Sequence, residues 1–127
     1  MVKKMKNTVV LTKSPRANKK FRVQFVDTGK TVDFGAEGYS DYTIHKDPLR
    51  MREYVRRHGG QIPKWVLGYD SPQGVQLAMT RVKKSTKENW ADPHTAGFWS
   101  RWLLWSFPNL PAAKKYIKDA YGFHIVI

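Results

Sequence analysis

Apolar and polar positions alternate with a period of two in the first third of the chain. Phe21, Val23 and Phe25 are separated by polar side chains, a pattern typical of a strand with one buried face. A turn signal at residues 27–30 follows, and the next four residues can form a return strand. Residues 8–12 are rich in β-branched side chains and favour a further strand. The pattern predicts a small antiparallel hairpin sheet.

Helical spacing replaces the alternation after Asp47. Asp47 and Pro48 suit the cap and the first turn of a helix. Met51, Tyr54, Val55 and His58 then follow the i, i+3, i+4, i+7 spacing of one apolar face. We expect this helix to run to about His58, where two glycines stop it.

Two more helices are expected toward the C-terminus. Asp92-Pro93 repeats the cap-plus-proline signal and predicts a helix that ends before Pro108. A third helix, capped by Asn109, is expected over residues 111–121. The apolar residues 123–127 would then add a strand or dock on a neighbouring molecule.

The remaining segment, residues 59–87, is expected to be an inserted hairpin. Residues 64–67 and 74–82 are its candidate strands, and the turn-rich residues between them would connect the two. We therefore predict one α+β domain over residues 19–127. In it, a small antiparallel hairpin sheet packs on two or three helices, preceded by a basic N-terminal arm of residues 1–18.

Composition narrows the possible functions. The chain has no cysteine, which excludes disulfides and thiolate metal sites. No secretory signal is evident, and no apolar run approaches the roughly 20 residues of a spanning helix. The formal net charge of +13 implies a negatively charged partner: nucleic acid, a membrane surface or an acidic protein face.

Five tryptophans occur in the chain, three of them between Trp99 and Trp105. The shared helical spacing of Phe98, Trp102 and Trp105 favours core packing over base stacking. Trp99 departs from that stripe, and we expect it to point outward as an interface anchor. The candidate polyanion-binding or interface residues are this indole and the cations of the arm and the first helix. They are Lys3, Lys4, Lys6, Lys13, Arg16, Lys19, Lys20, Arg50, Arg52, Arg56, Arg57 and Trp99.

Signals for catalysis are weak. His45, Asp47 and His58 could form a metal or nuclease site, but their spacing matches no ligand motif. The acidic cluster Asp33, Glu37 and Asp41 could hold a divalent cation; salt bridges to the arginine-rich helix are the preferred interpretation. No nucleophile or phosphate-loop motif is present, so we expect no enzymatic activity, no cofactor and no small-molecule substrate.

A series of motifs resembles a known family. They are Thr31-Val-Asp-Phe-Gly35, Gly38-Tyr-Ser-Asp-Tyr-Thr43, His45-Lys-Asp47, Arg57-His58, Glu88-Asn-Trp-Ala-Asp92 and the run Thr95 to Trp105. In order and spacing, over roughly residues 19–118, the chain is similar to short basic proteins of large nucleocytoplasmic DNA viruses, including algal and giant viruses. Residues 59–87 depart from that pattern as an insertion. The family has no agreed catalytic residues.

This resemblance implies a virion protein. We expect a minor capsid protein, located in the virion and assembled in the host cytoplasm, that tethers neighbouring major and minor capsid proteins. The alternative is a nucleic-acid-binding or genome-packaging protein without sequence preference, for which viral DNA is the partner. The inner-membrane surface is a further candidate partner for the basic residues.

Overall fold

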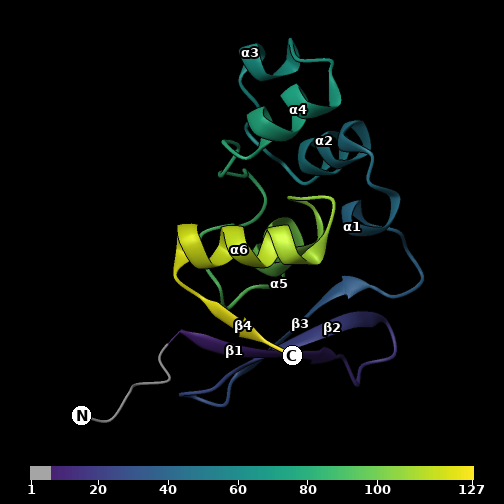
Figure 1. Cartoon of the computed structure of the whole chain (residues 1–127). Helices are drawn as coiled ribbons and strands as arrows, with labels where there is room; N and C mark the ends of the chain where they lie inside the picture. The colour runs from purple at the N-terminus through teal and green to yellow at the C-terminus, as the bar shows by residue number, and fades with distance from the viewer. Residues whose placement is uncertain (1–6) are drawn as a thin grey trace.

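The computed structural model describes residues 7–127, which form an α+β domain, as the sequence predicts. Figure 1 shows the sheet on one side, α5 and α6 over it, and α2, α3 and α4 beyond them. None of the described helices is long and apolar enough to cross a membrane. The strands are β1 (Thr8–Lys13), β2 (Lys19–Phe25), β3 (Thr31–Ala36) and β4 (His124–Val126). The helices are α1 (Tyr42–His45), α2 (Pro48–Arg57), α3 (Lys64–Leu67), α4 (Pro72–Met79), α5 (Ala96–Trp99), the π-helical turn η1 (Ser100–Leu104) and α6 (Leu110–Tyr121).

The sheet is mixed, with strand order β3-β2-β1-β4. The predicted hairpin is present as β2 and β3, with Phe21 opposite Phe34 and Val23 opposite Val32. The C-terminal segment adds β4 parallel to β1, which is one of the two alternatives expected for residues 123–127 and makes the sheet mixed. A parallel neighbour requires a crossover, and the chain between β3 and β4, ending with α6, supplies it.

The structure confirms the strand expected over residues 8–12, and the predicted N-terminal arm is therefore wrong over residues 8–18. Residues 8–13 form β1, which lies between β2 and β4, and residues 14–18 form the turn into β2. Val9 and Leu11 are buried under the helices. The apolar run of residues 9–11 in β1 thus outweighs the flanking lysines. Residues 1–6 of the predicted arm lie outside the described residues.

Residues 59–87 form two short helices instead of the predicted hairpin. Ser71 caps α4 by accepting the backbone N–H of Gly74, and Pro72 occupies its first turn. Val75, Ala78, Met79 and Val82 are all buried, and their spacing is that of a helix face. The β-branched valines suggested strands, but the spacing of the apolar positions decides the structure.

The tryptophan-rich segment begins later than predicted and is buried on several sides. Asp92 and Pro93 lie in a turn, and Thr95 caps α5. η1 follows directly, closed by the Trp105 N–H, which donates to the Ser100 carbonyl. Because the sheet covers one side of this segment and α6 another, it is not amphipathic (Figure 1).

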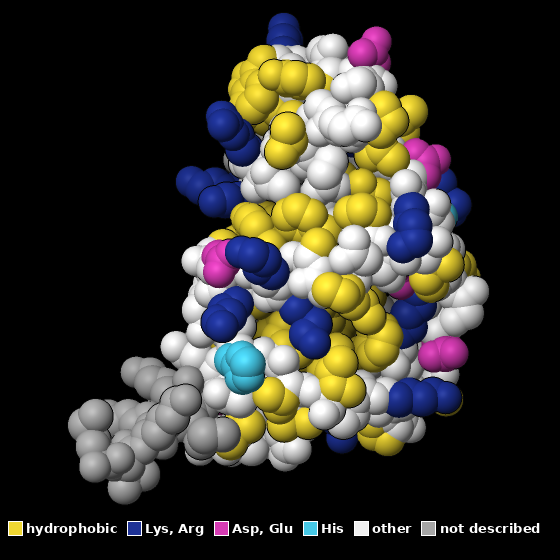
Figure 2. All heavy atoms as spheres, in the orientation of Figure 1, with side chains coloured by type: hydrophobic (Ala, Val, Ile, Leu, Met, Phe, Trp, Pro, Cys, Tyr) yellow, Lys and Arg dark blue, Asp and Glu magenta, His cyan; other side chains and the backbone are white. Residues whose placement is uncertain are grey.

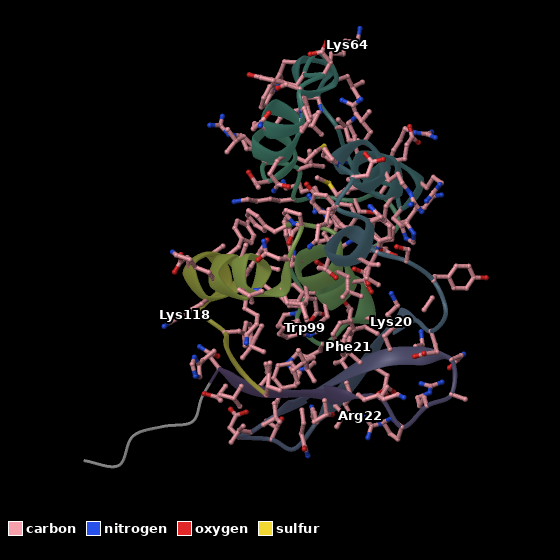
Figure 3. The ribbon with its side chains drawn as sticks, turned by 45° about the vertical axis from the view of Figure 1, so that its right-hand side comes forward. Lys20, Phe21, Arg22, Lys64, Trp99 and Lys118 are labelled. Carbon is pink, nitrogen blue, oxygen red and sulfur yellow. The ribbon has the colours of Figure 1, made fainter. Side chains whose placement is uncertain are left out.

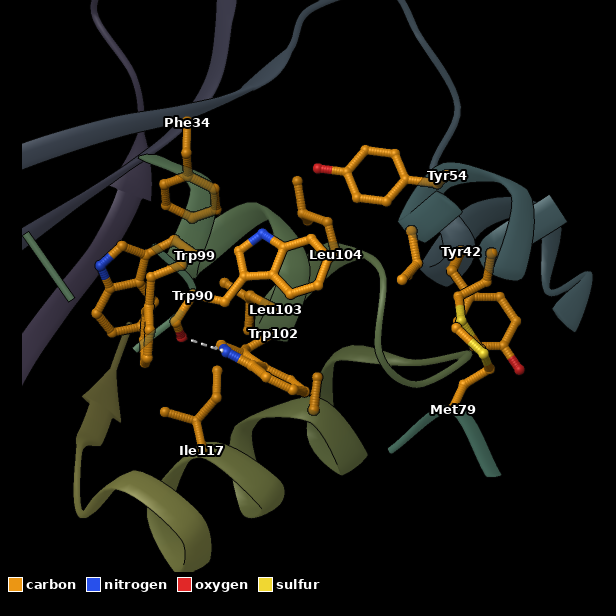
Figure 4. Packing of buried hydrophobic residues seen from close by; sticks show 14 of the residues in the cluster. Phe34, Tyr42, Tyr54, Met79, Trp90, Trp99, Trp102, Leu103, Leu104 and Ile117 are labelled. Carbon is orange, nitrogen blue, oxygen red and sulfur yellow. Dashed lines mark hydrogen bonds between the residues drawn. The ribbon is translucent and has the colours of Figure 1, made fainter. Parts of the chain in front are cut away.

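Trp99 therefore does not point outward, and its predicted role as an interface anchor is wrong. Its side chain is fully buried, with its ring against Phe25 and Phe34 of the sheet. Its indole N–H donates to the Pro93 carbonyl at 2.7 Å. Trp102 is buried in the same way and donates to the Trp90 carbonyl (Figure 4). Buried indoles need such acceptors, and this core supplies them.

A fully buried arginine joins η1 to the α4 region. Arg101 donates to the Met79 and Val82 carbonyls, at 2.7 and 3.2 Å, and to the Trp105 carbonyl at 2.6 Å. Its guanidinium also lies over the rings of Trp102 and Trp90. No carboxylate of the described residues pairs with it, and burial lowers its pKa to about 10. Carbonyls at the C-terminal ends of α4 and η1 replace a counter-ion.

The predicted salt bridges between the acidic cluster and the arginine-rich helix are wrong, because Asp33 and Asp41 have other partners. On the outer face of the sheet, Asp33 accepts two hydrogen bonds from Arg22 and one from Ser14. Asp41 binds Lys20 and caps α1. Both carboxylates therefore bind cations of β2, because the sheet brings these side chains together while α2 lies farther away.

We predict that Arg101→Met lowers the free energy of unfolding by about 3 kcal/mol, because the carbonyls of Met79, Val82 and Trp105 lose their hydrogen bonds from the guanidinium. Urea denaturation measures the effect. Arg57→Met, at an exposed arginine, is the control and should change stability by less than about 0.5 kcal/mol. An Arg101→Met protein as stable as the wild type would show that desolvation of the guanidinium cancels its hydrogen bonds.

We also predict that Asp33 contributes to the folding stability in a way that depends on pH. The hydrogen bonds from Arg22 and then Ser14 lower the pKa of Asp33 to about 2, below its value in the unfolded chain. A group whose pKa is lower in the folded than in the unfolded protein stabilises the fold at pH values above its unfolded-state pKa. This stabilisation is lost as the pH falls through the folded-state pKa. The stability difference between wild type and Asp33→Asn should therefore be largest near neutral pH and shrink between about pH 4 and pH 2. A difference independent of pH over that interval would contradict the assignment.

Candidate polyanion-binding groove

The described structure has a groove of about 710 Å³ between the sheet and α2. One wall is formed by the start of β2, the end of β3 and the loop that follows β3. The opposite wall is α2, and the floor comes from α5, η1 and the adjoining Trp105. The groove is open to solvent, and segments that lie far apart in the sequence line it.

Cations line both walls of this groove. Lys19 and Lys20 come from β2, and Arg50 and Arg57 come from α2, where a spacing of seven residues puts them on one side of the helix. Lys20 is fixed by Asp41, its Nζ lying 2.6 Å from the carboxylate. Lys19, Arg50 and Arg57 have no carboxylate partner among residues 7–127. Of the carboxylates that line the groove, Glu37 alone has no basic partner among residues 7–127. The unpaired charges in the groove are therefore mainly positive.

A close backbone approach shapes the β2–β3 wall. Gly35 has φ +79°, and a side chain there would meet the Cδ1 atom of Leu104 at 2.9 Å. Glycine therefore allows the end of β3 to turn across η1. The turn carries the chain into the loop before α1, where Asp41 caps that helix and holds Lys20. One carboxylate thus fixes both a helix start and a cation of the groove.

Stacked rings run along the α2 side of the groove. The Tyr54 ring stacks on His58 at 4.0 Å and on Trp105 at 4.2 Å between centroids. His45 lies on Trp105 at 5.4 Å. Burial, followed by the charge of Glu88, raises the pKa of the Tyr54 hydroxyl, so this group stays a neutral hydrogen-bonding group at physiological pH.

His58 is oriented by a carboxylate. Its Nδ1 lies 3.2 Å from Glu88 Oε2, and Trp90 donates its indole N–H to the other oxygen of Glu88 at 2.7 Å. The backbone N–H of Glu88 donates to the Ser85 hydroxyl, which itself donates to the His58 carbonyl. The arrangement fixes the imidazole at the edge of the groove, as a polar and ionisable contact for a ligand.

The predicted alternative of a metal site finds no support in the described structure. His45 and His58 are separated by the rings of Tyr54 and Trp105, so they do not converge. His45 Nδ1 already accepts the backbone N–H of Asp47 at 2.9 Å. Over residues 7–127, no group of three or more histidine or acidic side chains could hold a metal ion.

The other predicted site residues that the structure describes lie outside the groove. Lys13 lines a shallower hollow beside Lys20 and Tyr39, next to the groove, and Arg16 lies in the turn between β1 and β2. Arg52 donates to the Tyr69 carbonyl, and Arg56 pairs with Glu53. Lys3, Lys4 and Lys6 lie outside the described residues.

Sequence reasoning missed the groove residues that are not cations. Glu88, Ser100 and Tyr39 line it, and none was a candidate. The motifs quoted for the resemblance could have indicated these residues, because several of the motifs line the groove. They are the 38–43 loop, the Arg57-His58 pair, Glu88 and the run from Ala96 to Trp105.

Comparison with known proteins gives one match. Residues 9–58 match a family of unknown function (DUF5754). The match covers fewer than half of the 127 residues. It spans β1 to α2 and so includes the four groove cations but not the floor formed by α5 and η1. No curated protein and no solved structure matches the chain.

Proposed function

We propose that this protein is a binding protein, not an enzyme, and that its groove holds a phosphate-bearing polymer, nucleic acid, without sequence preference. One observation carries this proposal: two cations of β2 and two of α2 line opposite walls of one groove. A phosphate chain between these walls would contact both. Arginines can hold phosphate oxygens through two parallel hydrogen bonds, and lysines add point charges.

The surroundings of these cations suit the same ligand. Tyr39 lies on the groove wall and is 73% exposed, so its ring is free to stack on a base. The walls and floor also offer hydroxyl and imidazole groups from Ser40, Ser100 and His58. The net charge of +13 adds long-range attraction for any polyanion.

A second candidate is a minor capsid protein of a large DNA virus, located in the virion and bound to major or minor capsid proteins. The resemblance to viral proteins supports it, as does an exposed apolar surface over α3 and α4. Neither Trp99 nor the C-terminal segment supports this candidate, because Trp99 is buried and the C-terminal segment pairs with β1 of its own sheet. The two functions are compatible, since a particle protein can bind both a neighbour and the genome.

We predict that Arg50→Glu/Arg57→Glu weakens binding to a fluorescent single-stranded oligonucleotide by at least about tenfold, because two phosphate contacts become repulsive. Fluorescence anisotropy at several salt concentrations measures the dissociation constant. The slope of log affinity against log salt should fall by about 2 relative to the wild type.

A matched charge reversal on another face is the control. Lys114 and Lys118 of α6 have no acidic partner among residues 7–127, and Figure 3 shows Lys118 on the opposite side of the molecule from Lys20. Lys114→Glu/Lys118→Glu should weaken binding by less than about threefold, through net charge alone. Equal losses in both variants would contradict a role for the groove. Absence of binding by the wild type at physiological salt would leave the capsid function as the better proposal.

A further inference from the structure

The α3–α4 unit exposes a group of large apolar side chains. Trp65 is 50% exposed, Tyr69 45% and Leu77 71%, and Leu67 lies beside them in sequence at 52%. Figure 2 shows hydrophobic side chains at the surface of this end of the molecule, with Lys and Arg side chains among them. The opposite side of α4 faces inward, because Val75, Ala78 and Met79 belong to the core. These four side chains therefore leave much of their apolar surface available to a partner.

Three of the four exposed side chains line a cavity of about 350 Å³ between α3 and α4. Trp65, Tyr69 and Leu77 line it, and Ala78 and Gly74 belong to the lining as well. Gly74 keeps the floor open, because a side chain there would meet the Tyr69 ring at 2.7 Å. The Trp65 and Tyr69 rings pack edge to face at 6.2 Å. The surface is thus concave, with walls that are set before any ligand arrives.

Positive charge borders this cavity. The Arg81 guanidinium lies 5.9 Å from the centre of the Trp65 ring and lines the cavity itself. Lys64 precedes Trp65 on α3, and Lys83 and Lys84 follow Arg81 in exposed positions. Asp70 is the one acidic side chain between residues 54 and 87. An occupant with apolar and acidic groups would complement both features.

We propose that this cavity is the docking site for an acidic, amphipathic segment of a partner protein, which inserts one large apolar side chain between α3 and α4. Charge complementarity favours this occupant over a second copy of the chain, since two molecules of net charge +13 repel each other. The concave shape favours an inserted side chain over a flat lipid surface. Interface hot spots typically combine such an aromatic-lined cavity with arginine. This inference does not depend on nucleic acid in the groove.

A library of random 12-residue peptides displayed on phage, selected on the full chain, provides the probe. Selected sequences should combine Phe, Trp or Leu with several Asp or Glu. The best of them, synthesised with a fluorescent label, should bind at least about tenfold more weakly to Leu77→Ser and to Arg81→Glu. Both side chains are exposed, so neither change removes core packing. Ile127→Ser and Lys30→Glu are matched controls at exposed positions elsewhere and should bind like the wild type.

Three results would overturn the proposal. The first is a selection that yields no acidic apolar sequences, or only sequences insensitive to Leu77→Ser. The second is Leu77-dependent binding to vesicles of equal phosphatidylserine and phosphatidylcholine without peptide binding, which would identify a lipid surface. The third is Leu77-dependent dimerisation in sedimentation equilibrium, which would identify a second copy. Oligonucleotide affinity should be the same in Leu77→Ser and wild type, so a failure here is distinct from a failure of the groove proposal.

Discussion

The guanidinium of Arg101 is the group on which the arrangement of this fold depends. It connects the end of α4, the end of η1 and two indole rings in a fully buried position. A buried charge without a carboxylate is costly, and here the compensation comes from carbonyl oxygens and ring faces. Because these acceptors belong to segments 19 to 22 residues away as well as to η1 itself, the interaction attaches the α3–α4 unit to the sheet and its covering helices.

A second polar contact acts in the same way. The Tyr42 hydroxyl donates to the Gln76 side chain, and the Gln76 amide donates to the Ser106 carbonyl at 2.8 Å. Desolvation raises the pKa of Tyr42 to about 12, so the hydroxyl remains protonated and keeps its donor. α4 is therefore held from both sides, by Arg101 at its C-terminal end and by Gln76 on its flank. Its exposed side, with Leu77, is left free for contact with other molecules.

The groove and the apolar surface have different physical characters. The groove combines unpaired cations with rings and hydroxyls from distant segments, which suits an extended anionic chain. The α3–α4 surface combines a small aromatic cavity with a positive border, which suits an inserted apolar side chain. The two sites share no lining residue, so the two proposed partners would bind different parts of the molecule.

Local pattern determined much of the secondary structure. The β2–β3 hairpin, α2 with its Asp47 cap and α6 with its Asn109 cap were predicted correctly, because their signals lie within a few residues of one another. The lysines and arginines of the candidate site were also visible in the sequence. The exposure of Trp99, the extent of the N-terminal arm and the 59–87 segment were misjudged, since each depends on what covers it. Only the tertiary structure decided that α5 and η1 are enclosed by the sheet and α6, and that Lys19, Lys20, Arg50 and Arg57 line one groove. Burial and convergence arise from contacts between residues far apart in the chain, and local periodicity carries no information about them.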